Sequence, residues 1–327
     1  MLTVARSGRY GSGTLWQPRS DCGPDCLPGP EQVGTVSAAR RAGRLAALVG
    51  ALLFGALLLP VLPVLPASGR WFAGRAWART VLRALGVELL VRGRVPRRRV
   101  LLVANHISWL DIVAVLAITP ARLLAKHEVR GWPLIGALAA AGGTIFVNRT
   151  RPRDLPDTVR RIADVLRADG VVATFPEGTT WCGVVGCPAG CGCGSSGRFR
   201  PAVFQAAIDA GALVVPLTLR YQTGRSSDAT TTAAAFLGDD TLWASVRRVI
   251  AVRKLVVCAT ATAALHPEPA ADRRRLARAA ESAVRLAAPR PAVGTPPAVP
   301  VPPAVPAPSA PAEPVPPAAG EVLDLAA

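Results

Sequence analysis

The residues best suited to chemistry are His106 and Asp111, which lie five positions apart just after the apolar run 100–104. On one continuous helix they would point about 140° apart, because an α-helix has roughly 3.6 residues per turn. Ser108, a good helix N-cap followed three residues later by an acid, indicates that the chain instead turns between them. We therefore predict a strand-to-helix loop on which the Asp111 carboxylate accepts one imidazole proton and leaves the other ring nitrogen as a general base. In the alternative interpretation, Asp111 only caps the helix and His106 is an ordinary loop histidine.

Polar residues also follow two other apolar runs. Arg149 comes just after residues 144–147, and the turn 177–179 comes just after residues 171–175. Because ligands of open α/β sheets bind beyond the carboxyl ends of the strands, we expect these residues to share one rim with His106. The planar guanidinium of Arg149 suits a phosphate group. The alternatives are that Arg149 is a solvated loop residue and that the turn has no chemical role.

Apolar strands alternate with helices between residues 71 and 287. We predict strands at 100–104, 122–125, 144–147, 171–175, 213–219 and 255–262, and helices at 71–85, 108–118, 132–141, 155–168, 201–210, 240–253 and 267–286. Continuously apolar strands separated by helices are typical of a mostly parallel sheet that is covered on both faces. The sequence therefore predicts an α/β fold, mostly parallel and flanked by helices.

The segments outside this domain differ in composition. We predict a disordered segment at 1–38, a membrane-anchoring segment at 39–70, a Gly/Cys-rich insertion at 182–197 and a disordered Pro/Ala-rich tail at 288–327. The helix-competent part of the anchor, Leu45 to Leu59, ends where three prolines begin. Its fifteen residues reach about 22 Å, which is short of the roughly 30 Å hydrocarbon core. We therefore favour a shallow or re-entrant anchor flanked by arginines over a full span or a buried core helix.

The composition indicates contact with membranes. Of the 327 residues, half are hydrophobic, and 38 basic against 21 acidic residues give a formal net charge of +17. This charge favours anionic headgroups or phosphorylated substrates. With two Tyr and seven Phe and no interleaving of aromatic and basic residues, we predict no binding of nucleic acid. Because residues 1–38 do not resemble a signal peptide, we expect a cell-membrane protein whose catalytic domain lies on the cytoplasmic side.

The cysteines are concentrated in the insertion. Cys182, Cys187, Cys191 and Cys193 are separated by four, three and one residues, unlike the paired C-x2-C motifs of common zinc sites. We therefore favour a passive loop over a metal site or a redox-sensitive loop, and we predict no metal.

Four blocks of the sequence together resemble the bacterial lysophospholipid acyltransferases, the 1-acyl-sn-glycerol-3-phosphate acyltransferase family of the glycerolipid acyltransferase superfamily. The blocks are His106-x4-Asp111, Gly143–Arg149, Phe175–Thr179 and Val214–Leu217. The resemblance implies that His106 is the general base and Asp111 its partner, and it places the substrate-binding role on Arg149, Glu177, Gly178 and Thr179. It also implies membrane lipids as partners, acyl-CoA or acyl-carrier protein as the acyl donor, and no metal or redox cofactor. The expected reaction converts 1-acylglycerol-3-phosphate to phosphatidic acid.

The sequence departs from the family pattern after the Glu-Gly-Thr turn. The family usually has an arginine there, whereas this chain has Thr180 and Trp181. Arg200 stands where the family often has lysine and is our candidate for the missing phosphate contact. The change keeps another acceptor open, for example lyso-ornithine lipid. Two other classes also stay open: a lipid hydrolase, although the sequence has no G-x-S-x-G motif, and a non-catalytic membrane lipid-binding protein.

Overall fold

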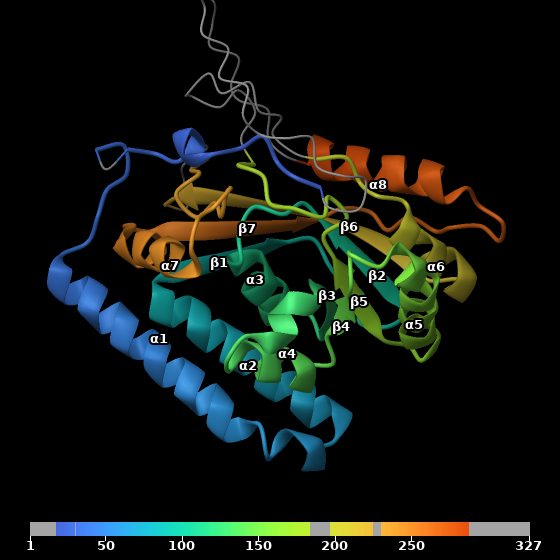
Figure 1. Ribbon diagram of the computed structural model, residues 1–327, viewed down its shortest axis with the longest axis horizontal. Helices are drawn as coiled ribbons and strands as arrows, with labels where there is room; N and C mark the ends of the chain where they lie inside the picture. Colours follow the sequence, from blue (N-terminus) through green and yellow to red (C-terminus); the bar gives the residue numbers. More distant parts are fainter. Residues whose placement is uncertain (1–17, 30, 184–196, 225–229, 288–327) are drawn as a thin grey trace, which may run out of the picture. The chain divides into compact units, whose positions relative to one another are not determined.

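The computed structural model describes residues 18–29, 31–183, 197–224 and 230–287 (Figure 1). These residues form a seven-stranded sheet in the order β1-β7-β6-β2-β5-β3-β4. The strands are β1 (Val87–Arg92), β2 (Val100–Ala104), β3 (Ala121–Lys126), β4 (Ile145–Val147), β5 (Val171–Thr174), β6 (Leu213–Thr223) and β7 (Leu255–Ala261). The predicted tail and most of the predicted insertion, including Cys187, Cys191 and Cys193, lie outside the described residues.

The sheet is mostly parallel, which confirms the predicted fold class. Strands β6, β2, β5, β3 and β4 run in one direction, whereas β7 is antiparallel to β6 and β1 is parallel to β7. The sequence analysis missed β1 and the reversal of β7. It also ended β6 four residues early, at Leu219, although the strand continues to Thr223 along β7. The carboxyl ends of the five parallel strands therefore lie at one edge of the sheet, as the site prediction requires.

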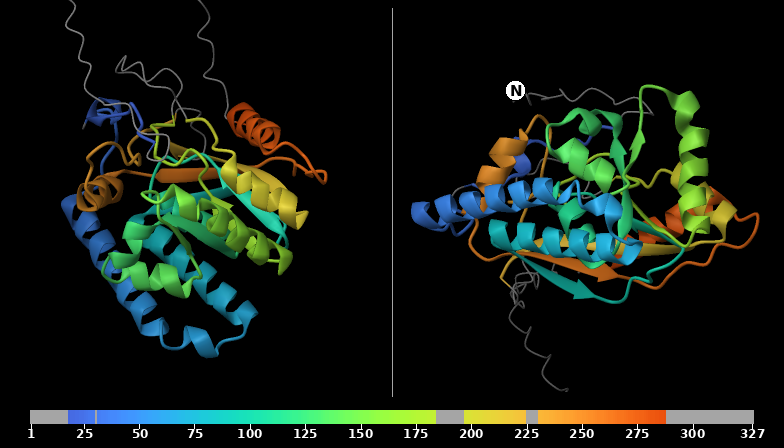
Figure 2. Two further views of the ribbon diagram at one scale, coloured as in Figure 1. Left: turned by 45° about the vertical axis from the view of Figure 1, so that its right-hand side comes forward. Right: turned by 90° about the horizontal axis from the view of Figure 1, so that it is seen from below.

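Helices cover both faces of the sheet (Figures 1 and 2). They are α1 (Ala38–Leu58), α2 (Ala67–Leu85), α3 (Leu110–Ile118), α4 (Ile135–Ala141), α5 (Leu155–Arg167), α6 (Ala202–Ala210), α7 (Leu242–Ala251) and α8 (Arg273–Leu286). Side chains of β2 alternate between two hydrophobic clusters: Val100 and Leu102 pack with α2, α3 and α7, and Leu101 and Val103 pack with α5, α6 and α8. Burial on both faces explains why every residue of β2 is apolar.

The N-terminal helix α1 lies beside α2 (Figure 2). Its apolar residues Leu53, Phe54 and Leu57 are exposed. It is longer than predicted, with 21 residues, because Ala38–Arg44 is helical too. Trp77 of α2 donates a hydrogen bond of 2.9 Å to the carbonyl of Ala51, and a Cβ at Gly55 would lie 2.5 Å from the Trp77 indole nitrogen. Only 17% of the apolar window of α1 is buried, which rules out a buried core helix. By length and composition α1 could cross a membrane.

The segment before α1 differs from the prediction of disorder for residues 1–38. Residues 1–17 lie outside the described residues, but Cys22 and Cys26 are buried and a 3-10 turn spans Pro24–Cys26. Val36 donates a backbone hydrogen bond of 2.9 Å to the last residue of α7, Ala251. The Gly/Pro-rich composition favours disorder, and the contacts that order this segment are tertiary, so they cannot be predicted from composition.

Candidate active site

His106 is placed at the sheet edge by the end of β2. Asn105, the residue between β2 and His106, forms hydrogen bonds with both backbone groups of Leu219 on β6. Its Nδ2 lies 3.0 Å from the carbonyl oxygen and its Oδ1 2.8 Å from the nitrogen of the N–H. These two bonds satisfy the backbone N–H and carbonyl of Leu219, where the pairing with β2 ends. The His106 ring then stacks on Phe175, which follows β5, with centroids 4.1 Å apart and planes 15° apart.

Asp111 holds the imidazole as predicted. Its Oδ2 lies 2.9 Å from His106 Nδ1 and also accepts the backbone N–H groups of Ile107 and Ser108, at 2.6 and 2.8 Å. The Asp111 side chain is fully buried, whereas 18% of the His106 side chain is exposed. With its Nδ1–H directed to the carboxylate, the imidazole has Nε2 left to accept a proton. The alternative in which Asp111 only caps the helix does not hold, because the oxygen that accepts the N–H of Ser108 also bonds His106.

Tyr221 is a member of this network that the sequence analysis missed. Its hydroxyl, on β6, donates a hydrogen bond of 2.6 Å to Asp111 Oδ1. Burial raises the pKa of Tyr221 well above its usual value, and the nearby Asp111 charge raises it further. In the sequence Tyr221 stands between Arg220 and Gln222, two residues beyond the predicted end of the strand at Leu219, so no local pattern marked it as a partner of Asp111.

Glu177 faces the histidine loop and not the surface of the site. It is 3% exposed, and its Oε2 accepts the backbone N–H of His106 at 2.7 Å. Burial raises the pKa of Glu177 well above its usual value, against the lowering effect of the His106 and Gly197 N–H groups. In this structure the Glu177 carboxylate orients the backbone of His106, and a role of Glu177 in binding substrate stays a prediction.

The turn after Glu177 is tied to its surroundings by backbone contacts. Gly178 has a φ of +79°, where glycine is favoured, and its carbonyl accepts a hydrogen bond from Arg149. Thr179 is half-buried on this turn. Thr180, which stands where the family usually has arginine, donates its hydroxyl to the carbonyl of Phe236. Trp181 donates its backbone N–H to the carbonyl of His106 at 2.8 Å.

Three cations gather on the other side of the turn. Lys126 ends β3, Arg149 follows β4, and Arg200 precedes α6. Burial is the main cause that lowers the pKa of each, and the neighbouring cations add to it: Arg200 lowers the pKa of Arg149, which in turn lowers that of Lys126. The structure thus brings Arg149 and Arg200 together, as predicted, and adds Lys126. Cations that repel one another in a partly buried place form a suitable site for a phosphate group.

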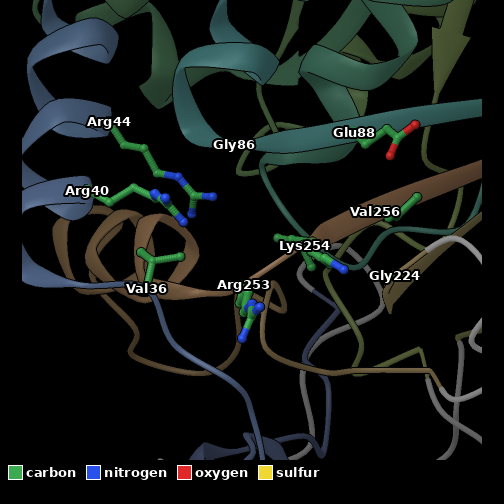
Figure 3. A pocket seen from close by; sticks show the side chains of 10 residues that line it. Val36, Arg40, Arg44, Gly86, Glu88, Gly224, Arg253, Lys254 and Val256 are labelled. Carbon is green, nitrogen blue, oxygen red and sulfur yellow. The ribbon is translucent and has the colours of Figure 1, made fainter.

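A cavity of about 610 Å³ lies farther along the same edge of the sheet, where β1 and β7 begin (Figure 3). Arg40 and Arg44 reach it from α1, and Arg253 and Lys254 line it before β7. Arg44 is engaged there, with hydrogen bonds of 2.8 Å to two carbonyl oxygens at the end of α7. The lining residues include neither His106 nor the turn 177–179, so this cavity is separate from the candidate active site.

Comparisons with known proteins point to one family. A family model described as Acyltransferase matches residues 88–220. The chain is 36% identical over 183 residues to the 1-acyl-sn-glycerol-3-phosphate acyltransferase of Neisseria meningitidis serogroup B, covering 55% of this chain and 66% of that one. It is 36% identical over 213 residues to the lyso-ornithine lipid O-acyltransferase of Pseudomonas aeruginosa, covering 65% of this chain and 77% of that one.

A solved structure supports the fold. The crystal structure of the 1-acyl-sn-glycerophosphate acyltransferase PlsC from Thermotoga maritima superposes with a TM-score of 0.55 at 16% identity, covering 76% of this chain and 96% of that chain. The fold, the contact between His106 and Asp111 at the sheet edge and the sequence matches agree. The chain therefore belongs to the acyltransferase family and is related to enzymes named for the acylation of 1-acyl-sn-glycerol-3-phosphate and of lyso-ornithine lipid.

Proposed function

We propose that the protein transfers a fatty acyl group from acyl-CoA or acyl-carrier protein to the free hydroxyl of a lysophospholipid. The observation that carries the proposal is the contact between His106 and the buried Asp111 at the carboxyl edge of the sheet. The proposed first acceptor is 1-acylglycerol-3-phosphate, because its phosphate suits the cations Lys126, Arg149 and Arg200. The product is then phosphatidic acid.

The pair acts through one proton. His106 Nε2 removes the proton of the acceptor hydroxyl while that oxygen forms a bond to the thioester carbonyl carbon. When the tetrahedral intermediate collapses, the carbon–sulfur bond breaks and the thiolate takes the proton back from the imidazolium. A well-placed general base contributes about 10²- to 10⁴-fold to the rate. During this cycle the Asp111 carboxylate stabilises the positive charge on His106.

Lyso-ornithine lipid is the second candidate acceptor. The Pseudomonas relative, which is named for that substrate, matches over 77% of its length. Thr180 in place of the usual arginine also leaves one cation fewer beside the turn, and its hydroxyl is bound to Phe236. With fewer positive charges beside the turn, an acceptor without a phosphate group is favoured.

The decisive experiment is an acyl-transfer assay on the full chain in membranes. Labelled acyl thioester is offered with a panel of lysolipids to the wild type, to His106→Ala and to a control, His266→Ala, which changes a histidine outside the site. We expect a diacyl product from the wild type and the control only, with the best acceptor identifying the headgroup. Free fatty acid as the main product would favour a hydrolase, and no turnover with any lysolipid would favour a lipid-binding protein.

We also propose that α1 lies in the interface of the cell membrane, with the catalytic domain on the cytoplasmic side. Its exposed face carries Leu53, Phe54 and Leu57, which are 63%, 55% and 71% exposed. The other face packs on α2, so the helix has one side available for lipid. In flotation with vesicles of anionic phospholipid, the Leu53→Asp/Leu57→Asp variant should lose binding. Leu286→Asp, which changes a 76% exposed leucine on α8, is the matched control and should bind like the wild type.

A further inference from the structure

Three cysteines from distant parts of the chain meet beside the active site. The sulfur atoms of Cys22, Cys26 and Cys182 all lie within 4.8 Å of one another. Their side chains are buried, with exposed fractions of 1%, 3% and 1%. A disulfide joins only two sulfur atoms, so a single disulfide does not account for a cluster of three. Clustered thiolates are ligands that zinc and other soft metals prefer.

The backbone around Cys22 and Cys26 suits a metal. The two residues form a C-x3-C motif, within the C-x2–4-C spacing typical of structural zinc sites. A 3-10 turn at Pro24–Cys26, closed by a 3.0 Å hydrogen bond from the Cys26 N–H to the Gly23 carbonyl, connects the two cysteines. Their sulfur atoms lie within 4.8 Å of each other. Tetrahedral bonds of about 2.3 Å place two sulfurs roughly 3.8 Å apart, so small side-chain movements would complete the coordination.

A hydrogen bond links the third cysteine to the motif. The backbone N–H of Cys182 lies 3.3 Å from the sulfur of Cys22 and donates to it. Backbone N–H groups directed at sulfur stabilise the negatively charged thiolate, as they do around metal-bound cysteines. The same contact joins the N-terminal segment to the loop after the turn 177–179, so the cysteines of both segments are held close together.

We propose that Cys22, Cys26 and Cys182 bind a structural zinc ion. Zinc fits because structural zinc sites use three or four cysteines in closed, buried surroundings. The fourth ligand is left unassigned, since the next cysteines along the sequence lie outside the described residues. The sequence analysis predicted no metal because it judged Cys182 only against its neighbours in the insertion and took Cys22 and Cys26 to be in a disordered segment.

The proposed ion would fix the loop that carries the catalytic base. Cys182 directly follows Trp181, whose N–H binds the carbonyl of His106. Pro18, in the same N-terminal segment as Cys22, lies against the turn at Gly178, where an added Cβ would come within 2.7 Å of it. Because metal binding adds to folding free energy, the ion would hold this segment over the turn and keep His106 in place.

The test is the metal content of the full chain purified in detergent without chelators. We expect about one zinc per chain in the wild type and in the control Cys258→Ala, which removes another buried thiol, on β7. Cys22→Ser and Cys182→Ser should lose the zinc. Zinc well below one per chain in the wild type, or zinc retained by both serine variants, would overturn the proposal. Iron with sulfide in place of zinc would overturn it as well.

A second measurement on the wild type does not depend on how the variants fold or on activity. Peptide mapping after alkylation should show Cys22, Cys26 and Cys182 protected from the reagent until a strong chelator is added. The reactivity of Cys258 should not change with the chelator. A disulfide between any two of the three cysteines, or equal alkylation with and without chelator, would contradict zinc binding at this cluster.

Discussion

Replacing Asp111 by asparagine tests whether its charge, and not only its shape, serves catalysis. Asp111 Oδ2 accepts three N–H groups, from His106, Ile107 and Ser108. In Asp111→Asn the amide oxygen can occupy this position and keep all three donors. The amide NH2 then faces the Tyr221 hydroxyl, which can turn to accept from it. The imidazole thus keeps its tautomer and orientation while the negative charge beside it is removed.

The expected loss follows from the attraction between imidazolium and carboxylate. Two unit charges about 4 Å apart attract by roughly 4 kcal/mol at an effective dielectric constant near 20. This attraction exists only after His106 has taken the proton, so its loss raises the barrier to proton transfer. Since about 1.4 kcal/mol corresponds to a factor of ten in rate, kcat should fall by about 10³-fold. The KM values should change little, because Asp111 is fully buried and does not face the substrates.

The assay compares steady-state acyl transfer and thermal unfolding of Asp111→Asn with those of Asp240→Asn. The control breaks an ion pair of 2.6 Å with Arg248, which is also largely buried, and leaves the His106 contacts unchanged. It should lose stability but keep kcat. A kcat in Asp111→Asn within tenfold of the wild type, in a folded variant, would refute electrostatic assistance by the carboxylate. An equal loss of kcat in both variants would attribute the effect to stability alone.

Three further predictions concern the residues around this pair. Arg149→Ala should raise KM for a phosphate-bearing acceptor far more than KM for the acyl donor; equal changes would argue against headgroup binding, and Arg149→Lys should recover part of the effect. Tyr221→Phe removes one hydrogen bond to the buried Asp111 carboxylate and should lower the free energy of unfolding by about 1.5–3 kcal/mol in denaturant titrations, whereas a loss near zero would contradict the bond. Because burial raises the pKa of Glu177, the native state binds this proton more tightly than the unfolded state, and its contribution to stability falls as pH rises above 4.5 towards the raised value. Glu177→Gln should lose this dependence, so melting curves of variant and wild type that stay parallel across pH would count against it.

The sequence alone determined the main parts of the candidate active site. The apolar run 100–104 followed by His106 and Asp111 predicted a buried strand, a turn and a helix start, all of which depend on neighbouring residues. The rule that parallel strands open at one edge then placed Arg149 and the turn 177–179 near His106. The strand predictions succeeded because periodicity and strand ends are local properties that can be read along the chain. The predicted cap was displaced by one residue, since α3 begins at Leu110 with Trp109, and not Ser108, at its N-cap position.

Only the tertiary structure decided which distant residues complete the site. Tyr221 is 110 positions from Asp111, and Cys22 is 160 from Cys182. No local pattern records such contacts, because they arise when separate elements pack on the same sheet. The direction in which Glu177 points was decided in the same way: the nearby His106 N–H turns its carboxylate inward. Sequence patterns indicate which elements form and where they end, whereas the partners of a buried polar side chain depend on what the whole fold places beside it.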